Sequence, residues 1–156
     1  MHHRIIKVLY VEEGIEQKLS SIMLEEAIAK ASLSYQIPPT TFTVCHDAFA
    51  ATEFLTASSF DVILASSNLS VLGPRDMFGF LKNAGCCVPM VYMTKRGTDI
   101  HMDKSTCKEY ESIGFAGVLF KKFTALQILK AGSATELTNF YLGLIITTIQ
   151  KYGFQL

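Results

Sequence analysis

Several apolar runs of this sequence end in residues that can do chemistry. Glu12 and Glu13 follow the run at 5–11, Ser66 and Asn68 lie at the end of the run at 61–66, Thr94 and Lys95 close the run at 88–94, and Lys121 follows the run at 117–120. Carboxylates can bind a divalent cation, and lysines can neutralise an anion. No acid stands at the end of the run at 61–66, although strand ends of this kind are where α/β proteins place their ligands.

The elements that must position these residues alternate between short apolar runs and segments of helical periodicity. We predict strands at 5–11, 41–46, 61–66, 88–94 and 117–120. We predict helices at 15–26, 48–57, 74–81, 105–113 and 124–131. Pro74 suits the first turn of a helix and Gly114 suits a helix end. This pattern predicts an α/β fold, a doubly wound five-stranded parallel sheet with helices on both faces.

Composition and charge exclude several classes of partner. The chain has 156 residues, 49% of them hydrophobic and 18% charged, with fourteen basic residues balancing fourteen acidic ones. Nucleic acids and anionic membrane surfaces need a concentrated basic face, so we expect neither as a partner. No apolar run is long enough to span a membrane and no cleavable leader is evident, so we expect a cytoplasmic protein. The four cysteines form no C-x-x-C pair, which favours reduced, mostly buried thiols over a metal site.

The segment at 132–156 extends beyond the predicted sheet domain at 5–131. Apolar residues recur in it at helical spacing, namely Leu137, Phe140, Tyr141, Leu144, Ile145 and Ile149. A helix this apolar must be covered. Either it packs on its own sheet, or it is a surface for a partner or a second copy of the chain.

Four segments resemble known elements of one family. VLYVEEG resembles the first strand and acidic pair of response-regulator receiver domains, and FDVILASSNLSVLG resembles their phosphoacceptor strand. VYMT resembles their switch-threonine strand, and GFAGVLFKKF resembles their lysine-containing element. The segments occur in the family's order, and together they cover 5 to about 131. The resemblance implies the flavodoxin-like receiver fold with strand order 2-1-3-4-5.

In that family a phosphohistidine donates a phosphoryl group to an aspartate, with Mg²⁺ held by neighbouring acids. The resemblance places Glu12 and Glu13 at the metal-binding acids, Thr94 at the hydroxyl that follows the phosphoryl group, and Lys121 at the family's lysine. It places Ser66 at the nucleophile. A serine hydroxyl has neither the charge that helps to hold Mg²⁺ nor the carboxylate that forms an acyl phosphate.

Other departures from the family's pattern agree with this loss. Ser70 and Lys122 stand where the family has prolines. Lys95 replaces the small residue after the switch threonine, and Val118 stands at the aromatic switch position. The separation between the last two motifs is longer than usual, and we expect a longer loop at 96–106.

These observations predict a degenerate pseudo-receiver, which is not an enzyme. We expect it to work through protein–protein interaction in a two-component or phosphorelay-type system. Its partner would be a signalling protein or a sensor kinase domain. The candidate surfaces, for that partner or for a homodimer, are the C-terminal helix and the face formed by the fourth helix, fifth strand and fifth helix.

Two alternatives remain open. The domain could still bind Mg²⁺ through Glu12, Glu13 and Asn68, or be phosphorylated at a non-standard residue. It could also be a ligand-binding or enzymatic flavodoxin-like domain, but it has no G-x-G-x-x-G, phosphate-binding loop or G-x-S-x-G motif. We expect no cofactor, with Mg²⁺ as the less favoured alternative, and we expect Lys121 to pair with Glu12 or Glu13.

Overall fold

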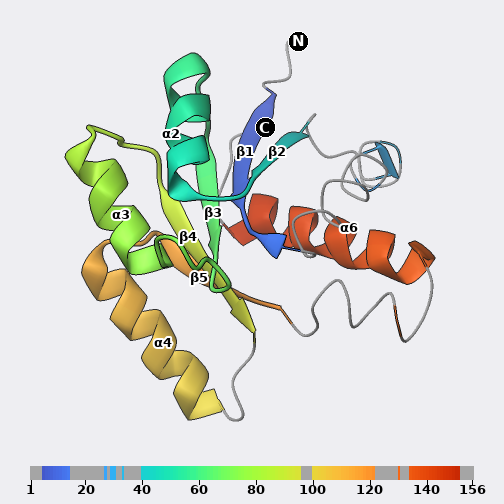
Figure 1. Ribbon diagram of the computed structural model, residues 1–156. Coiled ribbons are helices and arrows are strands. Elements are labelled where there is room, and N and C mark those ends of the chain that lie inside the picture. The colour runs from blue at the N-terminus through green and yellow to red at the C-terminus, as the bar shows by residue number, and fades with distance from the viewer. Residues whose placement is uncertain are drawn as a thin grey trace.

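Five parallel strands form one sheet in the computed structural model, which describes residues 5–14, 27, 29–30, 33, 40–95, 100–121, 130 and 134–151 (Figure 1). The strands are β1 (Ile6–Val11), β2 (Thr40–Cys45), β3 (Val62–Ser66), β4 (Met90–Lys95) and β5 (Gly117–Lys121). Their order in the sheet is β2-β1-β3-β4-β5. The predicted sheet and its strand order are therefore confirmed.

The register brings the carboxyl ends of the strands to one edge of the sheet. Val11 pairs with Cys45 on one side and with Ala65 on the other, and Lys95 pairs with Lys121. Because the strands are parallel and nearly in step, the residues that follow them meet at this edge.

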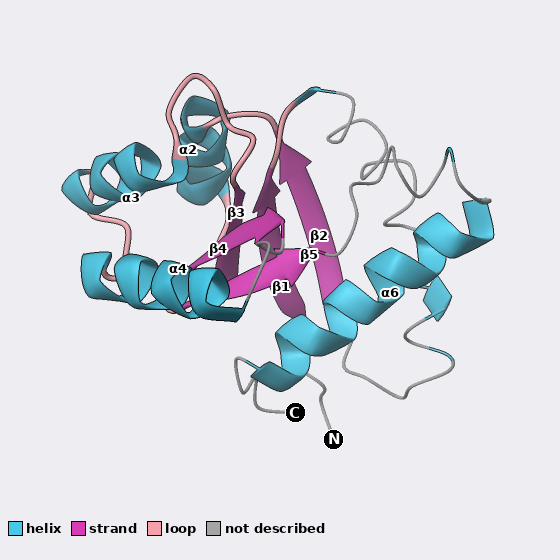
Figure 2. Ribbon diagram, turned by 90° about the horizontal axis from the view of Figure 1, so that it is seen from below, coloured by secondary structure: helices cyan, strands magenta, loops and turns pink. Residues whose placement is uncertain are grey.

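Four helices belong to the described residues: α2 (Ala48–Ala57), α3 (Pro74–Asn83), α4 (Ile100–Ile113) and α6 (Ala134–Lys151). The first three cover one face of the sheet, and α6 lies on the other (Figure 2). The helices predicted at 15–26 and 124–131 lie outside the described residues, apart from single positions. None of the helices in the described ranges is long and apolar enough to cross a membrane.

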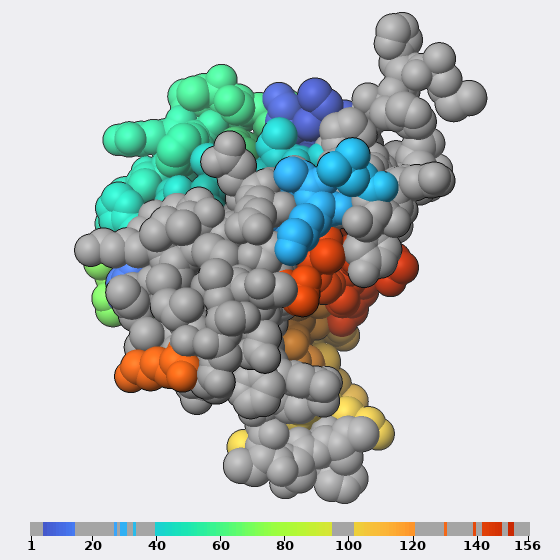
Figure 3. Space-filling model, turned by 90° about the vertical axis from the view of Figure 1, so that its right-hand side faces the viewer, coloured from blue at the N-terminus to red at the C-terminus, as the bar shows by residue number. Residues whose placement is uncertain are grey.

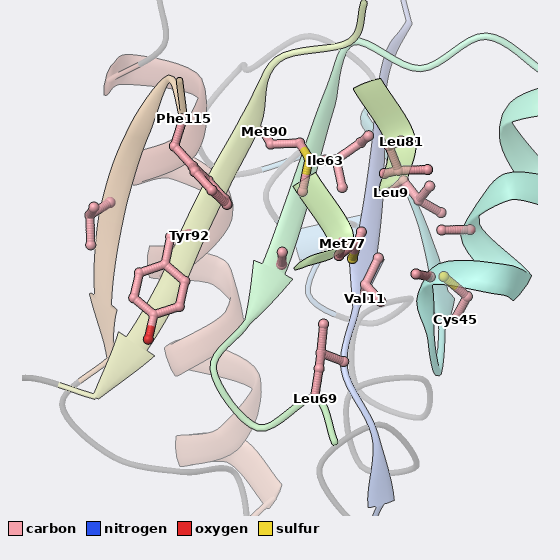
Figure 4. Packing of buried hydrophobic residues seen from close by; sticks show 14 residues of the cluster. Leu9, Val11, Cys45, Ile63, Leu69, Met77, Leu81, Met90, Tyr92 and Phe115 are labelled. Atoms are coloured by element: carbon pink, nitrogen blue, oxygen red, sulfur yellow. The ribbon is translucent and has the colours of Figure 1, made fainter. Parts of the chain in front are cut away.

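Alternate residues of each strand pack toward opposite faces, as strand geometry requires. In β1, Leu9 and Val11 face α2, α3 and α4, while Val8 and Tyr10 face α6. Figure 4 shows the first of these two clusters, in which side chains of β1, β3 and β4 meet Met77 of α3. A strand that is covered on both faces is apolar along nearly its whole length. For this reason β1 and β3 could be recognised from the sequence.

The C-terminal helix α6 runs across the sheet of its own chain (Figures 1 and 2). Leu144 and Ile145 belong to the cluster that covers this face of the sheet, and Ala27 joins them there. In the last turn of α6, the Lys151 ammonium donates a hydrogen bond of 2.8 Å to the backbone carbonyl oxygen of Val118 in β5. Part of α6 also reaches the surface (Figure 3).

The prediction of a loop at 96–106 is wrong from Ile100 onward, because α4 begins there rather than at residue 105. Asp103 in the first turn favours this earlier start, since a carboxylate there interacts well with the helix dipole. The helix ends at Gly114, as predicted, with a φ of 127°. A Cβ at this glycine would lie 2.6 Å from Cζ of Phe78 in α3, so a larger residue would also force that ring to move.

We predict that Ile145→Ala lowers the free energy of unfolding by about 2–5 kcal/mol, because the side chain is fully buried and its removal leaves a cavity. Urea denaturation measures the change. The control is Thr147→Ala on the exposed side of the same helix, for which we expect a change within about 0.5 kcal/mol. Equal effects of the two substitutions would contradict the packing of α6 on the sheet.

Candidate functional site

A buried hydrogen bond joins the ends of β1 and β3. The Ser66 hydroxyl donates to Oε1 of Glu12 over 3.2 Å. Glu12 is 1% exposed and Ser66 is 3% exposed, so water contributes little to either group. A buried carboxylate is costly unless it has hydrogen-bond partners, and the Ser66 hydroxyl is one such partner.

The loop after β3 is held close to the ends of both neighbouring strands. The backbone N–H of Asn68 donates to the Ser66 hydroxyl oxygen over 3.4 Å, and its side-chain amide donates to the backbone carbonyl of Glu13 over 3.3 Å. On the other side, the backbone N–H of Ser67 donates to the carbonyl of Met93 over 2.8 Å. Leu69 is buried and packs into the sheet cluster beside Val11 (Figure 4). These contacts fix where Ser66 and Asn68 lie.

The remaining predicted site residues lie on β4 and β5. Thr94 is half-buried and pairs with Phe120 in the register. Lys95 and Lys121 are paired at the same edge, but their side chains lie outside the described residues. The expected ion pair of Lys121 with Glu12 or Glu13 therefore stays a prediction. Val118 is buried in the cluster beneath α4, as an apolar core residue.

The acids at this edge are a poor match for the Mg²⁺ that the resemblance implies. Across the part of the chain that the structure describes, no three His, Cys, Asp or Glu side chains are grouped so that they could hold a metal ion. Glu12 and the half-buried Glu13 are two candidate ligands, but Ser66 supplies no third carboxylate and its hydroxyl occupies an oxygen of Glu12. Mg²⁺ binds through charged oxygen ligands while keeping several waters, and this edge offers it one carboxylate fewer than the resemblance implies.

Cys45 ends β2 beside the same edge, and its backbone carbonyl accepts the N–H of Glu12 over 3.0 Å. Burial raises the pKa of the Cys45 thiol to about 12, and the nearby Asp47 carboxylate acts in the same direction. The thiol is thus protonated at neutral pH and is a poor nucleophile. All four cysteines are free, as predicted, but only Cys45 is fully buried, so the expectation of mostly buried thiols is wrong.

Sequence reasoning missed an aromatic cluster that connects α4 to β4. Its member in β4, Tyr92, lies two residues before Thr94. Tyr92 and Tyr110 stack with ring centroids 3.7 Å apart and planes 8° from parallel. The guanidinium of Arg75 lies 5.4 Å from the Tyr110 ring centroid and also pairs with Glu109. Burial and the neighbouring Tyr92 raise the pKa of Tyr110, while Arg75 opposes this. Strand alternation could have placed Tyr92 on this face, but its helical partner depends on the packing of α4.

Solved structures similar to this chain are response regulators and their receiver domains. The chemotaxis response regulator CheY4 of Vibrio cholerae matches with a TM-score of 0.58 and 19% identity, over 95% of this chain and 98% of that one. A two-component response regulator from Clostridium difficile matches with a TM-score of 0.55 and 18% identity, over 81% and 90%. The receiver domain of the Francisella response regulator 1452 matches with a TM-score of 0.53 and 16% identity, over 86% and 97%.

The chain has the fold of a response-regulator receiver domain. No protein-family profile matches the sequence. No curated protein matches it either. At these identities the likeness to solved structures concerns the fold, and the chemistry of the strand ends must be judged from this chain's own residues.

We predict that Ser66→Ala lowers the free energy of unfolding by about 1–3 kcal/mol, because it removes a hydrogen bond to a buried carboxylate. Ser67→Ala is the matched control, since Ser67 is the adjacent serine and is exposed. Denaturant titration of both variants at pH 7 gives the comparison. If Ser66→Ala were as stable as Ser67→Ala, the hydrogen bond to Glu12 would have no structural importance.

The raised pKa of Cys45 gives a pH dependence with a definite sign. The folded state holds the thiol proton more tightly than the unfolded chain, whose thiol has an ordinary pKa of 9.0. This contribution to stability is complete below pH 9 and is lost as pH rises toward 12. Between pH 8 and pH 10, wild type should lose about 1.4 kcal/mol more unfolding free energy than Cys45→Ala. An equal loss in both proteins would mean that the thiol titrates normally.

Proposed function

We propose that this chain is a pseudo-receiver: a signalling module with the receiver fold that does not accept a phosphoryl group at the central strand end and acts through contacts with other proteins. The observation that carries the proposal is the buried hydrogen bond from Ser66 to Glu12. It lies at the end of β3, where the resemblance places the phosphoacceptor of the family.

The chemistry of Ser66 supports loss of phosphotransfer. Forming an acyl phosphate needs a carboxylate oxygen that can attack phosphorus, with a cation to neutralise the transferring oxygens. Ser66 has a hydroxyl instead, whose O–H already donates to Glu12 and whose oxygen accepts from the N–H of Asn68. Ser66 is also 3% exposed, which makes it a poor target for a protein kinase.

Retention of the fold without its nucleophile favours a role in binding. The proposed partner is a signalling protein or a sensor kinase domain of a two-component system. The face formed by α4 and β5 remains a candidate surface for it. The C-terminal helix is a weaker candidate for homodimer formation, because Leu142, Leu144 and Ile145 are buried within their own chain.

One observation favours the alternative of a receiver that still binds Mg²⁺. Glu12 and Glu13 are both present at the end of β1, where two carboxylates could hold a hydrated cation. The two functions differ in what Mg²⁺ and a phosphoryl donor do to the wild-type protein.

We predict that wild type, incubated with acetyl phosphate and Mg²⁺, gains no phosphoryl group by intact-mass spectrometry. Ser66→Asp should become phosphorylated under the same conditions, because it supplies the missing carboxylate. Without metal it should be less stable than wild type, since a second carboxylate would lie beside buried Glu12. Mg²⁺ at about a hundred times its Kd should return about 2.7 kcal/mol of stability to this variant.

Ser66→Asn is the matched control for that experiment, because asparagine has the shape of aspartate without its charge. We expect neither phosphorylation nor stabilisation by Mg²⁺ in this variant. Stoichiometric phosphorylation of wild type would reject the pseudo-receiver. Stabilisation of wild type by Mg²⁺ without phosphorylation would support the metal-binding alternative.

A further inference from the structure

A groove lies between α2 and α3, beside the amino-terminal ends of β3 and β4. Its volume is about 310 Å³, which is within the range of sites that bind small molecules. Its walls come from the second half of α2, the end of α3 and the segments that lead into the two strands. We call this feature the α2–α3 groove. Its lining includes Thr52, Leu55, Thr56, Phe60, Leu81 and Val88.

The lining of the groove carries no charge. None of the described residues in its wall has a charged side chain. The carbonyl oxygens of Phe80, Leu81 and Lys82, at the end of α3, each accept a backbone N–H from the turn that follows the helix. An ion that entered would lose its hydration without gaining an opposite charge, which is costly. The groove therefore disfavours ions of either sign and suits a neutral ligand.

Two threonine hydroxyls give the α2 side of the groove its polarity. The hydroxyl of Thr52 donates to the carbonyl oxygen of Ala48 over 2.9 Å, and that of Thr56 donates to the carbonyl oxygen of Thr52 over 2.8 Å. A hydroxyl has one hydrogen to donate and two lone pairs with which to accept. Since both hydrogens are used within the helix, these oxygens can offer a ligand only their lone pairs. The groove thus favours a ligand that donates.

The apolar part of the wall is held in place by the core. Leu55, Phe60 and Val88 are half-buried and pack against the cluster beneath α2 and α3, and Leu81 is a buried member of that cluster. The wall is therefore formed before any ligand binds, as is usual for small-molecule sites. An apolar cavity of roughly 150 Å³ is enough to hold benzene, so the groove has room for a ring-sized apolar body.

We propose that the α2–α3 groove binds a small neutral molecule that has an apolar body and a hydroxyl or N–H group. The body would pack on Leu55, Leu81 and Val88, and the O–H or N–H would donate to the hydroxyl oxygen of Thr52 or Thr56. The groove is at the opposite edge of the sheet from Ser66. The proposal therefore stands whether or not the pseudo-receiver proposal does.

The first test uses benzyl alcohol as the probe and the amide NMR spectrum of the full chain. We expect saturating shifts confined to residues 52–60 and 81–88. Benzylamine and benzoate have the same ring but are charged at pH 7, one positively and one negatively. Each should bind at least about tenfold more weakly than benzyl alcohol, because the groove offers no opposite charge. Equal binding of either ion would overturn the proposal, and so would shifts that do not saturate.

A second test addresses the threonine hydroxyls. The double variant Thr52→Val with Thr56→Val keeps the shape of both side chains and removes their acceptors. It should weaken the binding of benzyl alcohol about three- to tenfold, and it should not weaken the binding of toluene, which has no donor. The control is Thr106→Val in α4, where the hydroxyl makes the same kind of bond, to the carbonyl oxygen of Met102 over 3.0 Å. We expect no change of affinity in this variant.

A third readout uses the thiols that the chain already has. Cys87 is exposed and lines the groove, whereas Cys107 lies in α4. Saturating benzyl alcohol should slow the alkylation of Cys87 by iodoacetamide and leave the rate at Cys107 unchanged. Equal effects on the two thiols, or equal weakening by Thr106→Val and the double variant, would overturn the proposal. Shifts of the groove residues that depend on protein concentration without the probe would also overturn it, in favour of a second copy of the chain.

Discussion

The strand-end site depends on one constraint: a carboxylate at the end of β1 is buried, so its surroundings must supply hydrogen-bond partners. Ser66 on the adjacent strand supplies one of them. That contact in turn fixes the start of the loop after β3, where Asn68 reaches back to the end of β1. These contacts at the end of β3 hold the neighbouring strands and their loop together.

The sheet separates two regions with different physical properties. The carboxyl ends of β1 and β3 carry a buried glutamate and a buried serine, whereas the opposite edge opens into a groove lined by uncharged groups. α3 spans the distance between them. It begins at Pro74, just after the loop that carries Asn68, and ends at the groove. Its Arg75 pairs with Glu109 of α4, and its Lys82 lies over the ring of Phe78.

Sequence reasoning could predict the fold because the strands are buried on both faces. β3 is a short apolar run and β1 is one that only Lys7 interrupts. The polar residues that follow each run mark the strand ends where Glu12 and Ser66 lie. It could not predict that Ser66 would donate to Glu12, since that depends on the register between β1 and β3 and on the side-chain directions. The early start of α4, the stacking of Tyr92 on Tyr110 and the groove between α2 and α3 likewise depend on how helices pack, which periodicity does not determine.

The position of α6 has a consequence for the order in which the chain can fold. Leu144 and Ile145 cover a face of the sheet to which strands from the whole length of the chain contribute, and Lys151 contacts β5. During synthesis the ribosome releases all five strands before it releases this helix. The nascent sheet therefore has an apolar face that α6 does not yet cover, a state in which association with chaperones competes with misassembly. The contacts of α6 with β1 join residues far apart in the sequence, and a large share of such long-range contacts is typical of slower folding.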